Sequence, residues 1–272
     1  LLFSATMPGE ILKIAKKYMG DYDIIKVTDG NLTNKLTDQI YFEVSRSDRF
    51  EALCRIIDME EDFFGLVFCR TKVEVDTISS HLMERGYDAD GLHGDMSQAH
   101  REKILGKFKK KVVNILVATD VAARGIDVQD LTHVINFSLP HGPEAYVHRI
   151  GRTGRAGKEG IAVTFITSSE YRKLQYIIKV AKTDIRKEHL PKVKDVIKSK
   201  LNRIKSSLEN IIKTDINEKF IELSKDLLAK NDPEEILAAL LQHSFGGEID
   251  TKSYSNINET VIDKNGKTRL FV

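Results

Sequence analysis

The feature that most restricts the fold is an alternation, between residues 40 and 181, of short apolar runs with stretches of helical periodicity. We expect strands at 40–44, 65–69, 89–92, 114–118, 134–137 and 160–166, and helices at 49–59, 73–85, 98–108, 143–152 and 171–181. Runs such as Gly65–Cys69 are apolar throughout, which is typical of strands buried on both faces. The pattern therefore predicts an α/β fold with a parallel sheet and helices on both faces.

Segments before residue 40 are predicted to be shorter. Residues 1–6 read as a buried strand and are followed by a helix that begins near Pro8 and stops at Gly20. A brief strand is expected at Ile24–Val27, and the Asp, Gly, Asn and Thr residues of Thr28–Thr37 indicate a linker.

Polar clusters follow several of the predicted strands. Arg70-Thr71, Gly94-Asp95 and Thr119-Asp120 each come directly after an apolar run or close behind it. In open parallel sheets the ligand site lies outside the carboxyl ends of the strands. These clusters therefore predict a site at that edge of the sheet.

A basic run with regularly spaced glycines lies at 146–157. Its arginines, Arg149, Arg152 and Arg155, are three residues apart, which predicts that they share roughly one side of a helix. A guanidinium has five donors and no acceptor, so phosphate and carboxylate oxygens are its natural partners. The alternative is a solvated basic helix, since most charge runs are solvated faces.

The chain after Pro191 is predicted to be all helical. Ile197, Leu201, Ile204, Leu208 and Ile211 form a coiled-coil-like stripe, and a second stripe comprises Ile216, Phe220, Leu223 and Leu227. Asp232-Pro233 is a helix start. These helices either fold back on the sheet domain or associate with a second copy, and we favour the second copy. Residues 248–263 are polar and expected to be loose, and 267–272 read as the beginning of a strand.

Composition indicates the cellular compartment and limits the classes of partner. The net charge of +2 over 272 residues means that any basic face must be local. No apolar run reaches the length of a membrane span. Two cysteines, Cys54 and Cys69, are too few for a disulfide framework, so a reducing cytoplasm is expected. The chain opens on Leu-Leu-Phe-Ser-Ala-Thr without an initiator Met, and we expect it to be part of a larger protein.

Several motifs now occur together in one order. They are Ser4-Ala5-Thr6, Val67-Phe68-Cys69-Arg70-Thr71-Lys72, His93-Gly94-Asp95, Gln98-x-x-Arg101, Thr119 to Asp127, and His148 to Arg155. Over about residues 1–180 the chain resembles the C-terminal half of a DEAD-box RNA helicase. The tail resembles that of bacterial members, in which a helical dimerisation domain is followed by an RNA-binding domain.

The resemblance implies a domain plan. Residues 1–37 would be the end of an N-terminal RecA-like domain and a linker, and 38–187 the second RecA-like domain. Residues 188–250 would be the dimerisation domain, with the homodimer contact at about 190–245. Residues 251–272 would be a flexible segment and the first strand of a truncated RNA-binding domain.

The resemblance also implies roles. Arg152 and Arg155 would reach the γ-phosphate of ATP, with Asp127 and Gly125 at the nucleotide. His148 would couple to Ser4 and Thr6, although a histidine taken alone is more often structural. The implied RNA contacts are backbone-directed donors: Arg70, Thr71, Gly94, Arg101, Thr119, Arg124 and Gly125.

Two motifs that ATP hydrolysis needs are not in the sequence. It contains neither a Gly-x-x-x-x-Gly-Lys-Ser/Thr loop nor Asp-Glu-Ala-Asp, and Gly154 to Glu159 lacks the required glycine spacing. The phosphate loop and the Mg²⁺ ligands are therefore expected in a preceding domain. RNA-stimulated ATP hydrolysis would belong to the whole protein and not to this chain alone. The competing interpretation is a non-catalytic RNA-binding and dimerising scaffold.

Overall fold

The computed structural model describes residues 9–25, 36–124, 126, 128, 130–155 and 157–257. Within these residues the chain forms two compact units. The first contains 9–50 and 62–189, and the second contains 51–61 and 190–257. The first unit is organised around a sheet and the second around helices.

The sheet of the first unit has seven strands in the described residues. They are β1 (Thr37–Glu43), β2 (Gly65–Cys69), β3 (Ala89–Leu92), β4 (Ile115–Thr119), β5 (His133–Asn136), β6 (Gly160–Ile166) and β7 (Arg186–Lys187). Their order is β3-β4-β2-β5-β6-β1-β7, and every pairing is parallel. The predicted α/β fold with a parallel sheet is confirmed.

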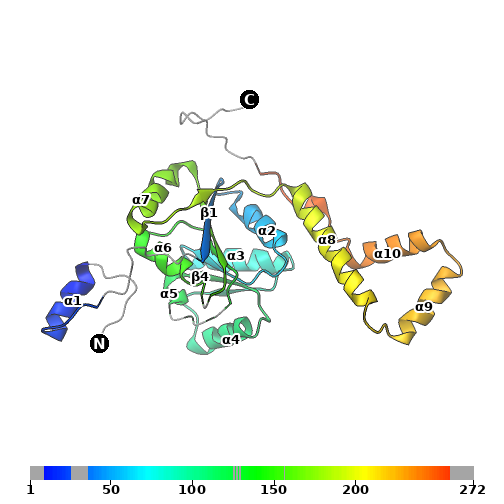
Figure 1. Cartoon of the computed structure of the whole chain (residues 1–272), viewed down its shortest axis with the longest axis horizontal. Coiled ribbons are helices and arrows are strands. Elements are labelled where there is room, and N and C mark those ends of the chain that lie inside the picture. Colours follow the sequence, from blue (N-terminus) through cyan, green and yellow to red (C-terminus); the bar gives the residue numbers. More distant parts are fainter. Residues whose placement is uncertain are drawn as a thin grey trace, which may run out of the picture. The chain divides into compact units, whose positions relative to one another are not determined.

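Helices connect the strands and cover the sheet (Figure 1). They are α3 (Lys72–Glu84), α4 (Gln98–Lys109), α5 (Asp120–Ala123), α6 (Pro143–Ile150) and α7 (Tyr171–Ala181), with α1 (Gly9–Met19) ahead of β1 in the sequence. Helix α2 (Arg49–Met59) follows β1 in the sequence, and most of it belongs to the second unit. The connection from β2 to β3 runs in one direction along the sheet, whereas those from β3 through β7 run in the other. Because such crossovers are right-handed, α3 lies on one face and α4 to α7 on the opposite face.

This winding places a crevice at the middle of the sheet. The chain leaves β2 toward one face and leaves its two neighbours, β4 and β5, toward the other. In parallel sheets the reversal of winding is the point at which ligands bind. The loops after Cys69, Thr119 and Asn136 therefore border the expected site.

The core explains why the strand runs are apolar throughout. All five residues of β2 are buried, and Leu66 and Phe68 pack in one cluster with Ile104 and Phe108 of α4. A second cluster contains Tyr146 and Ile150 of α6 and Leu174 and Ile177 of α7. The hydroxyl of Tyr146 is buried in this cluster and donates to Gln39 Oε1 at 2.9 Å. Burial raises the pKa of Tyr146 far above its ordinary value.

Several local predictions differ from the structure. Thr37, assigned to the linker, is the buried first residue of β1. Ile24 and Ile25 are not in a strand, and the rest of that predicted strand lies outside the described residues, as do residues 1–8. Two short elements, α5 and β7, were not predicted, because four and two residues are too few to show a period.

The second unit contains α8 (Val193–Ile212), α9 (Glu218–Leu228) and α10 (Pro233–Phe245). Asp232 caps α10 by accepting from the backbone N–H groups of Glu234 and Glu235, which confirms the predicted helix start. None of the helices in the described residues is long and apolar enough to cross a bilayer.

Residues 51–61 anchor α8 within this unit. Lys200 Nζ lies 3.0 Å from Asp58 Oδ2, and the Tyr254 hydroxyl donates to the same carboxylate. Arg203 donates to the carbonyls of Asp58 and Glu60, so it satisfies acceptors at the end of α2 that have no helical partner. In contrast, neither α9 nor α10 has a buried residue.

Candidate functional site

A cavity of about 320 Å³ lies at the expected crevice. Five of its lining residues were predicted from the sequence: Arg70, Thr119, Arg124, His148 and Arg152. Predicted RNA contacts and predicted nucleotide contacts therefore meet in one cavity. Asp120 and Arg149, which the sequence placed in a polar cluster and in the basic run, also line it, whereas His141 was not predicted.

Arg149 lines the cavity, but its donors are used within the protein, contrary to the prediction that three arginines face a ligand together. Its side chain is only 2% exposed, and its Nε and Nη2 atoms donate to the two oxygens of Asp120 at 2.6 and 2.8 Å. Nη1 donates to Asn136 Oδ1 at 3.0 Å and to the Ser138 carbonyl at 2.8 Å. The guanidinium also lies over the Phe68 ring, 4.9 Å from its centroid.

These contacts give Arg149 a structural task. Four of its donor directions are used, as a buried guanidinium requires. The bidentate pair joins α6 to the start of α5, and the bonds to Asn136 and Ser138 join it to the end of β5. Arg149 therefore fixes the helix that precedes the other two arginines.

Arg152 and Arg155 do not lie on a helix. Helix α6 ends at Ile150, and Gly154 adopts a left-handed conformation with φ +66°. A Cβ at Gly154 would lie 2.3 Å from Thr37 Oγ1, so the turn needs glycine. The prediction of one helical face is therefore wrong for these arginines, which a loop carries. The glycines that break the helix were visible in the sequence.

The two loop arginines have different surroundings. Arg152 lines the cavity, and its Nη1 donates to the Ile126 carbonyl at 2.9 Å. Arg155 is exposed, and its Nε donates to the Gly151 carbonyl at 2.6 Å. His148 lies on α6, exposed and facing the same cavity. The remaining predicted nucleotide and coupling residues lie outside the described residues: Ser4, Thr6, Gly125 and Asp127.

Two predicted RNA contacts are helix N-caps. Thr71 Oγ1 accepts from the Glu74 N–H at 3.1 Å, and Thr119 Oγ1 accepts from the Ala122 N–H at 3.4 Å. Since each hydroxyl acts as an acceptor in its cap, its proton can still be donated to a ligand oxygen. Gly94 is exposed and Arg101 donates to the Ala122 carbonyl at 3.4 Å, but neither lines the cavity.

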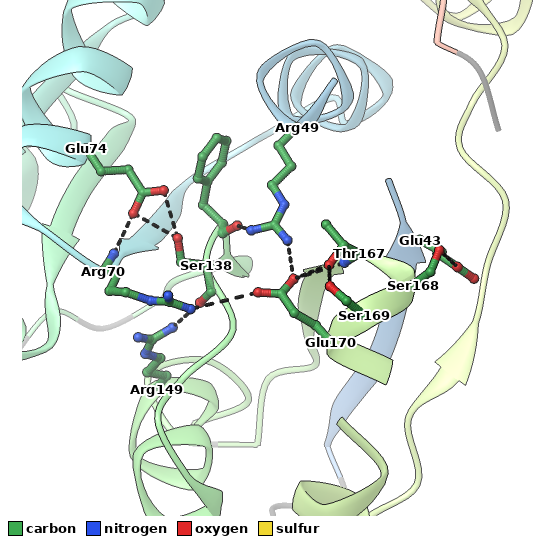
Figure 2. Close-up of polar contacts among 11 residues, drawn as sticks. Glu43, Arg49, Arg70, Glu74, Ser138, Arg149, Thr167, Ser168, Ser169 and Glu170 are labelled. Atoms are coloured by element: carbon green, nitrogen blue, oxygen red, sulfur yellow. Dashed lines mark hydrogen bonds and ion pairs between the residues drawn. The ribbon is translucent and has the colours of Figure 1, made fainter. Parts of the chain in front are cut away.

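A second cavity of about 520 Å³ adjoins the first, and Arg70 lines both. Figure 2 shows the polar network beside it. Glu74 accepts from the Arg70 N–H at 2.7 Å and from the Ser138 hydroxyl at 2.8 Å. Arg49 donates to Glu170 and, at 2.9 Å, to the Phe137 carbonyl.

Glu170 is held in this network as a carboxylate. Burial opposes its ionisation, but the Thr167 N–H, Arg49 and the Thr167 hydroxyl together hold its pKa below the ordinary value. Its Oε1 lies 3.8 Å from Arg70 Nη2. Sequence reasoning missed Glu170 and Ser138, although both follow strands at the edge where the polar clusters were predicted.

No group of three or more His, Cys, Asp or Glu side chains in the described ranges could hold a metal ion. The basic lining of the first cavity instead suits oxyanions, because Arg70, Arg124 and Arg152 all border it.

Comparison with known proteins agrees with this geometry. Residues 48–157 match the family described as helicase conserved C-terminal domain. The chain is 41% identical over 242 residues to the DEAD-box ATP-dependent RNA helicase CshA of Geobacillus kaustophilus, covering 89% of this chain and 52% of the relative. It thus spans about half the length of that curated relative.

Solved structures give the same assignment. The S. cerevisiae Dbp5 structure bound to RNA and ADP BeF3 matches with a TM-score of 0.65 and 27% identity, over 69% of this chain and 50% of that one. The E. coli DEAD-box protein SrmB, bound to regulator of ribonuclease activity A, matches with a TM-score of 0.54 and 32% identity, over 57% of this chain and 92% of that one. The chain belongs to the DEAD-box RNA helicase family and carries its C-terminal RecA-like domain.

Proposed function

We propose that this chain is the second motor domain of an ATP-dependent RNA helicase that remodels RNA duplexes. The observation that carries the proposal is the single cavity in which Arg70, Thr119 and Arg124 meet His148 and Arg152. A preceding RecA-like domain would hold ATP and Mg²⁺. RNA binding and nucleotide binding would then share one surface, as a motor that couples the two requires.

Arg152 and Arg155 are proposed to complete the nucleotide site from this side. In the structure each donates to a backbone carbonyl. A phosphate oxygen is a stronger acceptor than a neutral carbonyl, because charge-assisted hydrogen bonds are roughly twice as strong. The nucleotide, when bound, supplies the γ-phosphoryl group on which negative charge develops. Arginine fingers contribute about 10³–10⁵ in rate in comparable sites.

The neighbouring residues are proposed to support that contact. Arg149 and Asp120 fix α6, which carries His148 and leads into the loop of Arg152. His148 would couple this helix to Ser4 and Thr6, and Asp127 and Gly125 would contact the nucleotide. The RNA-facing donors are guanidinium and hydroxyl groups, which suit phosphate and 2′-OH oxygens, so we expect weak sequence preference and salt-dependent affinity.

The experiment measures RNA-stimulated ATP hydrolysis by the protein with both motor domains. Arg152→Ala is expected to lower kcat by at least about 10³, whereas Arg172→Ala, an exposed arginine on α7, leaves it unchanged. Wild-type kcat in Arg152→Ala would refute the finger assignment. The 272-residue chain alone is expected to bind RNA without hydrolysing ATP. If the two-domain protein also binds RNA but shows no ATPase activity, the scaffold interpretation is correct.

We also propose that the second unit forms a homodimer through residues of about 190–245. Large apolar side chains are exposed on its helices and on the segment between α8 and α9: Leu201, Ile211, Ile212, Ile216, Phe220, Ile221, Leu223, Leu228, Leu237 and Leu240. A groove of about 730 Å³, lined by Leu208, Leu241, Phe245 and other residues of α8 and α10, is open beside them. Contiguous apolar surface of this kind marks a protein interface, and a second copy offers the same surface in return.

Light scattering at micromolar concentration tests the dimer. Wild type is expected at twice the chain mass, and Phe220→Asp, which charges a side chain that is 68% exposed, at the monomer mass. Val112→Asp charges an exposed apolar residue of the first unit and should leave the dimer intact. A monomeric wild type would refute the proposal.

The buried, free thiols Cys54 and Cys69 support a reducing, cytoplasmic setting.

A further inference from the structure

Beyond the motif residues, the second cavity has a basic surround. Arg46, Arg49 and Arg70 line it, together with the carboxylates of Glu74 and Glu170. Lys173, near the start of α7, adds a fourth cation. Its pKa is lowered by burial and by the neighbouring Arg70 and Arg149, although Glu170 opposes this. Three arginines and two carboxylates thus line the cavity, and the first turn of α7 carries Lys173 at the same edge of the sheet.

The two carboxylates are already engaged by other partners. Glu170 accepts from Arg49 and from the Thr167 N–H, and Glu74 accepts from Ser138 and the Arg70 N–H. By contrast, Arg46 and Lys173 have no hydrogen bond or ion pair within the described part of the chain. Their charges are therefore the ones least compensated here.

Arg46 is presented by an ordered turn. It lies exposed between β1 and α2, where the Ser45 hydroxyl donates to Asp48 Oδ2 at 2.8 Å and accepts from the Asp48 N–H at 3.2 Å. The Ser47 hydroxyl also donates to Asp48, at 3.4 Å. Asp48, the acid nearest in sequence, is thus held by two serines and makes no ion pair with Arg46.

We infer that Arg46 and Lys173 bind the phosphate backbone of an RNA strand that passes Arg70, beyond the contacts of the family motifs. The inference rests on the proposed function, because Arg70 is the shared member of both cavities. RNA is favoured over a compact anion because the basic groups continue from one cavity into the next. A positively charged groove that follows the backbone is the way proteins bind single strands without sequence preference.

The test measures RNA affinity against salt concentration. The protein with both motor domains is titrated with a single-stranded polyuridine oligonucleotide and a non-hydrolysable ATP analogue, from about 50 to 200 mM salt. The slope of log K against log salt is negative, and each lost phosphate contact on a single strand lowers its magnitude by about 0.7. Arg46→Gln/Lys173→Gln is therefore expected to lower it by about 1.4, and Arg70→Gln by about 0.7.

The control is Lys110→Gln/Lys179→Gln, which removes two exposed charges from the same unit. Since helices run antiparallel to the strands they follow, Lys110 and Lys179, at the ends of α4 and α7, lie toward the opposite edge of the sheet. The control is expected to keep the wild-type slope. A thermal melt of each variant shows that it is folded.

The possible results separate the two proposals. A wild-type slope in Arg46→Gln/Lys173→Gln, with a lower slope in Arg70→Gln, overturns the further inference and leaves the proposed function intact. The same holds if the control lowers the slope equally, because the effect is then one of net charge. A wild-type slope in Arg70→Gln as well overturns the RNA site of the proposed function and the inference with it.

Discussion

Replacing Asp120 by asparagine would test whether Arg149 is a structural residue. The substitution keeps the shape of the side chain and one acceptor oxygen, but it removes the negative charge and one of the two bonds to the guanidinium. Arg149 would keep its bonds to Asn136 and Ser138 and would remain buried. It would therefore become a buried charge without a counter-charge in contact.

The expected cost follows from the burial of the two partners. Breaking a fully buried ion pair on one side costs about 3–5 kcal/mol. Arg149 is fully buried, but the Asp120 side chain is 31% exposed, so solvent screens part of the interaction. We expect Asp120→Asn to lower the free energy of unfolding by about 2–4 kcal/mol. For a unit of this size that corresponds to a fall in Tm of roughly 5–15 °C.

Urea unfolding followed by far-UV circular dichroism measures this change. Tryptophan fluorescence is not an option, because the chain contains no tryptophan. Asp130→Asn is the matched control, because Asp130 pairs with Lys158 at the exposed surface, and its curve should superimpose on that of the wild type. Arg149→Met and the double variant complete a cycle. A change below about 0.5 kcal/mol in Asp120→Asn, or effects of the single variants that add within about 0.5 kcal/mol, would refute the structural role.

Three further predictions concern other parts of the chain. Gly154→Ala should lower the free energy of unfolding by more than about 1 kcal/mol, measured by urea unfolding, because φ is +66° and the Cβ would meet Thr37; Gly94→Ala, with open space around it, should cost less. Glu170 has a folded pKa below its unfolded value near 4.5, so its contribution to stability is present above that pH and lost as pH falls through the folded pKa. Glu170→Gln should therefore be less stable than wild type at neutral pH, and the two unfolding curves should converge in acid. Asp58→Asn should speed amide exchange in α8 and around Tyr254, whereas Asp195→Asn, an exposed residue on α8, should not.

The strands were predicted well because their signal is local. Gly65–Cys69, Ala89–Leu92 and Gly160–Ile166 have the predicted bounds, although Asp90 interrupts the apolar residues of the second strand. Strands buried on both faces are rich in apolar residues, so the bounds of an apolar run are close to those of the strand. The edge of the sheet that carries the site followed from the same reasoning, since polar residues come directly after these runs.

The role of Arg149 could not be predicted from spacing. Its partner Asp120 lies 29 residues earlier in the sequence and on a different element. A three-residue spacing predicts a shared face only for residues within one helix, and helix α6 ends at Ile150. The repeated glycines indicate that the helix ends, because a glycine destabilises a helix by about 1 kcal/mol relative to alanine and is common just after its last residue.

The helical tail shows the same limit in another form. Periodicity identified apolar stripes but not the surface that covers each one. The N-terminal half of α8 is held by residues 51–61, about 140 residues earlier in the chain, through Lys200 and Arg203. Helices α9 and α10, of 11 and 13 residues, bury no side chain in the described structure. Helices of about 12–15 residues or fewer are marginal in water without tertiary packing. Within the described residues no side chain of these two helices is buried, and that is why we propose a second copy as their cover.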